Sequence, residues 1–142
     1  MAHTQADKWD IYAVLVDYAD AIDRRDMARV ECCFAPDATA TYSGMSVGPG
    51  RGEIVRFLTE NLTSLASTHF VGNVQIDFAS ASSATCDSFV MATHVVDSGG
   101  GTRLRIRGLR YLDTFAQLEG QWQIANRIHI PVWSTEVDGE LL

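Results

Sequence analysis

The apolar positions in the first part of the chain recur with the period of an α-helix. Between residues 10 and 24 they are spaced by four, three and four positions, at Ile11, Leu15, Tyr18 and Ile22. This spacing places the four side chains on one stripe of a helix, from which they can pack against a core. The same reasoning predicts a shorter helix over 26–34 and a third helix over 52–64.

Capping and breaking residues mark where these elements begin and end. Asp26 is a favourable N-cap for the second helix, and we expect Pro36 to end it. A short strand is expected over 38–42. The segment 44–52 holds four glycines and a proline, which predicts a loop.

After residue 68 the pattern becomes that of β-strands. Four segments, 70–78, 84–96, 103–116 and 121–132, are β-rich and are separated by short runs of turn-forming residues. The short turns between the last three segments predict an antiparallel meander. Gly72 and Gly108 are candidate bulge positions, at which the sheet would bend. The acidic residues from 135 onward predict a loose tail.

Helices first and a long sheet afterwards predict an α+β fold with the helices on one face of the sheet. The 142 residues contain no repeat and correspond to one domain over residues 1–142. A strongly curved, mostly antiparallel sheet would hold the helices on its concave face. That arrangement would leave a pocket inside the fold.

Composition and charge exclude several classes of partner. The net charge is −7 and Lys8 is the single lysine, so the chain would repel a nucleic-acid backbone. No apolar run approaches the ~20 residues of a membrane-spanning helix. The first ten residues lack the apolar core of a signal peptide, from which we expect a cytoplasmic protein. The cysteines, Cys32, Cys33 and Cys86, lack metal-ligand spacing, and we expect reduced, packed thiols.

One basic stretch stands out, with arginines at positions 103, 105, 107 and 110. The first three alternate with other residues, as they would on one face of a strand. We interpret them as a solvated or interface face rather than as a nucleic-acid site. This stretch and the segment 130–134 are the surfaces that we expect to meet a neighbouring subunit.

Several ionisable residues stand in apolar surroundings. Asp23 lies at the end of the first helix, where the helix dipole disfavours a carboxylate unless a donor or cation compensates. His69 precedes an apolar strand, and His94 lies inside another. Arg127 and His129 alternate on the last strand and so share one sheet face. Taken alone, each is explained as well by a solvated helix end or a packed core residue as by catalysis.

Five segments together carry a resemblance to a known family. They are YADAIDRRD at 18–26, CFAPDA at 33–38, THFVGN at 68–73, YLDTF at 111–115 and GQWQIANR at 120–127. The chain from about residue 8 to 133 resembles the SnoaL-like group of the nuclear transport factor 2-like superfamily. That group includes scytalone dehydratase, bile-acid dehydratase and hexachlorocyclohexane dehydrochlorinase. The resemblance implies a cone-shaped α+β barrel and an enzyme that uses no cofactor and no metal.

The resemblance also assigns roles to residues. It implies that Asp23 holds His69, which removes a proton from carbon, and that Tyr18 and Arg127 complete the catalytic set. An imidazole held in this way is fixed in tautomer and stabilised when it becomes protonated. We expect the remaining pocket wall to bind a small hydrophobic substrate and to include His94, Tyr42, Phe57, Met91, His129 and Trp133.

The expected activity is that of a dehydratase-like lyase. A ketosteroid-isomerase-like enzyme would share the fold but normally uses an aspartate base. A polyketide cyclase would fit the same pocket. An epoxide hydrolase would need an Asp–Arg–Asp set, for which Asp23, Arg127 and Asp113 are the available residues. The β subunits of ring-hydroxylating dioxygenases share the fold without chemistry. Relatives of the group imply a homo-oligomer, with a trimer favoured over a dimer.

Overall fold

The computed structural model describes residues 3–142. Helix α1 (Gln5–Arg24) begins five residues before the predicted start. A capping box explains this, because the Thr4 side chain accepts from the backbone N–H of Asp7, whose carboxylate accepts from the backbone N–H of Thr4. The predicted apolar stripe of α1 is buried, which confirms that part of the prediction.

Two shorter helices follow. Helix α2 (Met27–Cys32) has Asp26 as its N-cap, as predicted, with the carboxylate accepting from the backbone N–H of Arg29. Helix α3 (Arg51–Asn61) buries Ile54 and Leu58. No helix in residues 3–142 has both the length and the apolar content required to cross a membrane.

Six strands form one sheet in the order β2-β1-β6-β5-β4-β3. The strands are β1 (Phe34–Tyr42), β2 (Met45–Val47), β3 (Ala66–Ser80), β4 (Ser83–Asp97), β5 (Thr102–Leu118) and β6 (Gln121–Asp138). Strands β4 to β6 form the predicted antiparallel meander, β3 extends it by pairing with β4, and β1 pairs with β6 in parallel. The sheet is therefore mostly antiparallel.

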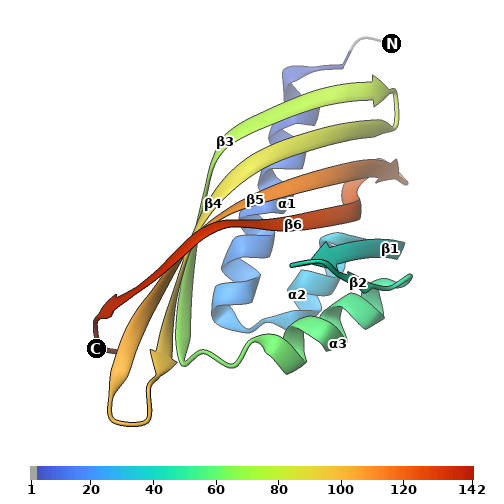
Figure 1. Cartoon of the computed structure of the whole chain (residues 1–142). Coiled ribbons are helices and arrows are strands. Elements are labelled where there is room, and N and C mark those ends of the chain that lie inside the picture. The colour runs from blue at the N-terminus through green and yellow to red at the C-terminus, as the bar shows by residue number, and fades with distance from the viewer. Residues whose placement is uncertain (1–2) are drawn as a thin grey trace.

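The sheet bends sharply near the middle of its long strands and carries the helices on its inner side (Figure 1). The strand pairing shifts register after Gly72 in β3 and after Gly108 in β5. A shift of this kind bends and twists a strand. The extra residue follows Gly72 in β3, as predicted, whereas near Gly108 the extra residue is Val132 of β6, so the bulge predicted at Gly108 lies on the neighbouring strand. The core fills the space between the helices and this inner face. The fold is the expected α+β barrel.

Three predictions of local structure were wrong. Pro36 does not end a helix, because α2 stops at Cys32 and Pro36 lies in β1, where the pairing with β6 is irregular between Phe34 and Thr39. The segment 44–52 is not all loop, since it holds β2 and the start of α3. The tail from residue 135 is not loose as far as Asp138, because β6 continues to that residue alongside β5.

Candidate active site

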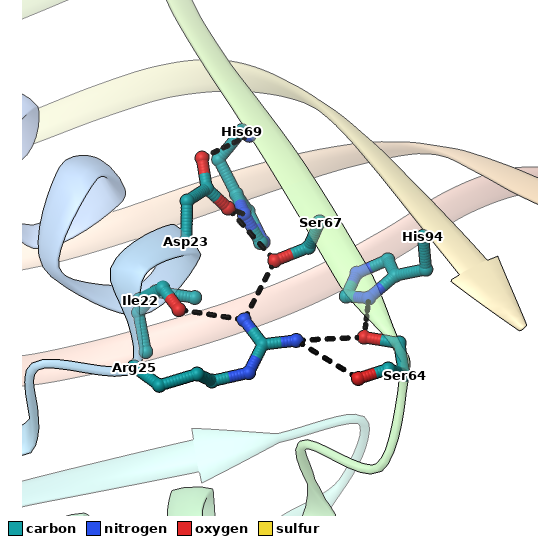
Figure 2. A network of polar contacts seen from close by, with 7 residues as sticks. All are labelled: Ile22, Asp23, Arg25, Ser64, Ser67, His69 and His94. Atoms are coloured by element: carbon teal, nitrogen blue, oxygen red, sulfur yellow. Dashed lines mark hydrogen bonds and ion pairs between the residues drawn. The ribbon is translucent and has the colours of Figure 1, made fainter. Parts of the chain in front are cut away.

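The packing of α1 against β3 brings Asp23 and His69 into contact. The His69 ring Nδ1 lies 2.7 Å from Asp23 Oδ1, and the His69 backbone N–H donates to Asp23 Oδ2 at 2.8 Å (Figure 2). The side chain of His69 is 7% exposed and that of Asp23 is 21% exposed. Two separate contacts from one residue fix the carboxylate relative to the ring.

Arg25 connects this pair to the loop that follows α3. Its backbone is left-handed, with φ 58° and ψ 28°, and it caps the C-terminus of α1. From there its guanidinium turns back toward β3 and donates to Ser67 Oγ at 2.8 Å, to Ser64 Oγ at 2.9 Å and to two backbone carbonyls (Figure 2). Ser67 Oγ donates in turn to Asp23 Oδ1 at 2.8 Å.

The loop that follows α3 also contacts the second histidine, His94 of β4. Ser64 Oγ lies 3.0 Å from His94 Nδ1, and the rings of His94 and His69 meet edge to face with centroids 5.4 Å apart. Arginine, serine and two histidines therefore form one continuous network across α1, β3 and β4 (Figure 2). His94, which the resemblance places in the pocket wall, thus lies beside His69.

Counting donors assigns a tautomer to His69. A guanidinium only donates, so both serine hydroxyls accept from Arg25, and Ser67 donates its own hydrogen to Asp23. Asp23 as a carboxylate only accepts, so His69 Nδ1 must carry a hydrogen and Nε2 a lone pair. Ser64 Oγ has one hydrogen and a second lone pair, so its 3.0 Å contact with His94 Nδ1 fits either tautomer of His94. His69 Nε2 is therefore the free base of the network.

The charge states support this assignment. Burial alone would raise the pKa of Asp23, but the hydrogen bonds from His69 and Ser67 outweigh it and leave that pKa below its usual value. Burial, together with the charges of Arg107 and Arg25 nearby, lowers the pKa of His94 to about 4. Asp23 is thus ionised and His94 is neutral near pH 7.

Arg127 is buried completely and is paired inside the chain. Its guanidinium forms two hydrogen bonds of 2.8 and 2.7 Å with Asp113, also fully buried, and it lies between the rings of Tyr18 and Tyr111 at 4.3 and 4.0 Å. Its Nη1 has no hydrogen-bond partner within residues 3–142. Asp113 supplies the anion that a buried arginine requires, so Arg127 needs no charge from a substrate.

The two tyrosines of the predicted site are close together. The hydroxyl oxygens of Tyr18 and Tyr42 lie 3.2 Å apart, and the ring of Tyr42 stacks on Phe57 and lies near His129. Burial raises the pKa of Tyr18 and that of Tyr42, so both hydroxyls stay protonated. Burial also lowers the pKa of His129 to about 4, and its Nδ1 is covered without a partner in the described part of the chain.

Met91 and Trp133 lie on the other face of the sheet. Met91 is paired with Phe70, and Trp133 is paired with Gly108, whereas His69 is paired with Ala92. Successive side chains point to opposite faces of a strand, so Met91 and Trp133 point away from His69. They border a hollow of about 290 Å³ on the outer face, and their predicted place in the pocket wall is wrong.

Two hollows border the histidine network. One of about 270 Å³ lies between α1 and β3 and is lined by Asp23, His69 and Tyr12, among others. The other, of about 110 Å³, is lined by His94, Ser64 and Arg107, among others. The largest hollow described, about 420 Å³, lies near Trp122 and touches neither histidine, so we do not assign it to the site.

Sequence reasoning missed Arg25, Ser64 and Ser67. Their positions before His69 and after Asp23 carried a signal in principle, since serines flanking a candidate His–Asp pair are natural hydrogen-bond partners. The three cysteines are free, as expected. No group of three His, Cys, Asp or Glu side chains within residues 3–142 is placed to hold a metal ion.

Comparison with known proteins identifies relatives along most of the chain. The model of the SnoaL-like domain family matches residues 4–128. Uncharacterised proteins of Mycobacterium tuberculosis and Mycobacterium bovis are each 30% identical over 127 residues, which cover 87% of this chain and 84% of theirs.

Solved structures show the same fold at lower identity. A hexachlorocyclohexane dehydrochlorinase of Novosphingobium barchaimii superposes with a TM-score of 0.86 at 16% identity, covering 96% of this chain and 94% of that one. A candidate scytalone dehydratase of Novosphingobium aromaticivorans gives 0.81 at 22% identity, covering 95% and 90%. With the family model matching this much of its length, the chain belongs to the SnoaL-like domain family.

Proposed function

We propose that the protein is a cofactor-independent lyase, dehydratase-like, in which His69 removes a proton from carbon. The observation that carries this proposal is the pair at 2.7 Å between His69 Nδ1 and the Asp23 carboxylate. That contact leaves the Nε2 lone pair as the free base. No hydrogen-bond partner for Nε2 occurs within residues 3–142, and the atom is not among the fully covered polar atoms. We propose that the substrate presents its C–H bond to this atom.

The reaction is an elimination. Nε2 of His69 takes the proton, the electrons of the C–H bond form the new double bond, and the bond to the β-hydroxyl breaks. The hydroxide leaves as water by taking up the proton that His69 now carries, which restores the base. Asp23 stabilises the imidazolium that forms, and a positioned base of this kind contributes roughly 10²–10⁴ in rate.

His94 is the proposed donor to the oxygen on which charge develops. We assign its hydrogen to Nε2, with Nδ1 accepting from Ser64, and its ring is neutral, so it acts as a hydrogen-bond donor rather than as a cation. Tyr18 of α1 and Tyr42 of β1 are buried, protonated hydroxyl groups and are further candidate donors. Donors fixed before the reaction stabilise an enolate or a leaving oxygen without reorganisation. In this proposal Arg127 takes no part in the chemistry. Its guanidinium lies over the ring of Tyr18 and fixes the position of that ring.

The proposed substrate is a small, mostly hydrophobic molecule, with Phe57 and His129 as further wall residues. The fold neighbours include proteins named for dehydration and for dehydrochlorination, which are both eliminations. An isomerase would use the same base but would return the proton to another carbon. Product analysis separates the two, because only elimination releases water or chloride.

A general probe tests the base without knowledge of the substrate. Nitrobenzisoxazole opens when a base takes its ring proton and the N–O bond breaks, and the product is coloured. We expect His69→Ala and Asp23→Asn each to lower the rate by at least about 100-fold, with folding checked by circular dichroism. His3→Gln and Asp17→Asn are matched controls outside the network and should react at the wild-type rate. Wild-type rates in His69→Ala would contradict the proposal.

A second copy of the chain is the proposed partner of the outer face. Phe70, Phe89, Met91, Val132 and Trp133 are 43–75% exposed there and lie around one hollow. A contiguous apolar surface of this kind is typical of an interface. We propose a homotrimer in the cytoplasm. Light scattering should give three times the 15.6 kDa of one chain, and Phe70→Asp should give a smaller species.

A further inference from the structure

Arg107 is an arginine on the inner face of the sheet. In the strand pairing it lies between Ala92 of β4 and Ser134 of β6, in the same row of side chains as His69. Its neighbour along the same face, Leu109, is fully buried, whereas Arg107 itself is half-buried. Its charge is therefore partly withdrawn from water.

No internal partner meets this charge. Eleven residues are Lys or Arg, and Lys8 is one of them, which leaves ten arginines. Each of the other nine donates a hydrogen bond or lies within 4.0 Å of a carboxylate. Arg107 has neither contact within residues 3–142. This is unexpected in a chain with 18 acidic residues and a net charge of −7.

The nearest acids on the inner face are already bound. Glu136 and Asp138 accept from Arg103 and Arg105 at the end of the sheet. Asp23 accepts from His69 and Ser67. A half-buried cation without a partner is costly unless an anion completes it, so the missing group is one that the chain does not supply.

The surroundings of Arg107 form a small polar site. Arg107, His94 and Ser64 all line the hollow of about 110 Å³. Burial is the main cause that lowers the pKa of His94 and of His129 to about 4, and the charge of Arg107 adds to it in both. Both rings are therefore neutral, and His94, which lines the hollow, is available to donate to an anion beside Arg107. Typical ligand pockets measure about 300–1,000 Å³, so this hollow accommodates only one end of a ligand.

We propose that Arg107 binds a carboxylate, and hence that the substrate of the His69 base carries an acid group at one end. That the substrate carries an acid group rests on the function proposed above, whereas the binding of a carboxylate at Arg107 does not. The planar guanidinium matches a carboxylate through two parallel hydrogen bonds. With the acid group at Arg107, the adjoining carbons lie beside His94, whose ring is next to His69.

The experiment compares benzoate with benzamide, which has the same shape without the charge. Binding to the full-length protein is measured by titration with amide NMR shifts. We expect benzoate to bind at least about tenfold more tightly than benzamide, and Arg107→Met to remove this difference. Arg107→Lys should retain part of it, and serves as the variant to use if Arg107→Met does not fold. Arg103→Met removes the same charge from the same face and should bind benzoate as wild type does.

The two proposals fail separately. His69→Gln should bind benzoate normally even though it is expected to lack the base, so binding remains measurable if the protein proves not to be a lyase. Equal affinity for benzoate and benzamide in the wild type would overturn the carboxylate site. The assignment to Arg107 would be overturned if Arg107→Met and Arg107→Lys both bind benzoate with the wild-type affinity, as the control Arg103→Met is expected to do.

Discussion

The buried pair of Arg127 and Asp113 yields the most quantitative prediction. Both side chains are 0% exposed and are joined by two hydrogen bonds. The substitution Asp113→Asn removes the charge of one partner and keeps its shape. It leaves a buried guanidinium with no counter-charge, and breaking a buried pair in this way costs about 3–5 kcal/mol. This is a large share of the ~5–15 kcal/mol that stabilises an ordinary domain.

The loss can be measured as a shift in thermal midpoint. For a domain of this size about 1 kcal/mol lowers Tm by roughly 2–4 °C, so Asp113→Asn should lower Tm by roughly 6–20 °C. Calorimetry at one protein concentration is the assay, because an oligomer would make Tm depend on concentration.

The double variant Asp113→Leu with Arg127→Met separates the charge from the packing. It removes both charges and keeps most of the volume, so it should recover a large part of the lost stability. It should also retain the nitrobenzisoxazole reaction, since we assign Arg127 to the order of Tyr18 and Tyr111 rather than to chemistry. A loss below about 1 kcal/mol in Asp113→Asn would refute the reasoning.

Three further predictions concern the network, the protonation of the inner face and the bend. Arg25→Met should lower the proton-abstraction rate roughly 10–100-fold, because both serine hydroxyls lose their donor. His94 and His129 have a folded pKa of about 4 against ~6.5 in the unfolded chain, so the native state binds fewer protons than the unfolded state between these values. The free energy of unfolding should therefore fall as the pH falls from 6.5 to 4, by on the order of 1–2 kcal/mol for each partly exposed ring. Urea midpoints measured across this pH range test it. Gly108→Ala should shift Trp133 fluorescence, since a Cβ there would lie 2.3 Å from the indole Nε1.

Each of these predictions has a matched control. Arg24→Met removes an arginine next to Arg25 whose side chain is 70% exposed, and should react at the wild-type rate. His94→Gln should make the loss of stability below pH 6.5 shallower, and an unchanged slope would contradict the assignment. Gly100→Ala, at a glycine with no atom within 4 Å of an added Cβ, should leave the tryptophan spectrum unchanged.

The fold was predictable where one face of an element is apolar and its partner is close in sequence. The stripe that includes Ile11 and Leu15 predicted α1, but its first turn depends on Thr4 and Asp7, which are polar. The acidic residues from 135 looked like a tail because their partners, Arg103 and Arg105, lie more than 30 positions earlier. Local composition does not contain that pairing.

The site was predictable only in part. Asp23 and His69 are 46 positions apart and were linked by resemblance, not by any local pattern. The role of Arg25 depends on a left-handed residue that returns its side chain to β3, which no periodicity encodes. The face of the sheet on which Met91 lies could have been predicted. Successive residues of a strand point to opposite faces, so Met91 lies opposite to Ala92, which is paired with His69 and shares its face.

The tautomers of the two histidines test the central claim most directly. Nitrogen NMR of the imidazole rings distinguishes a hydrogen on Nδ1 from one on Nε2, and His69→Gln and His94→Gln assign the signals. At pH 7.5 we predict a hydrogen on Nδ1 of His69, with Nε2 free to accept, and a hydrogen on Nε2 of His94. A His69 ring that carries its hydrogen on Nε2 would contradict the account, because the nitrogen that faces a substrate would then have no lone pair to take a proton.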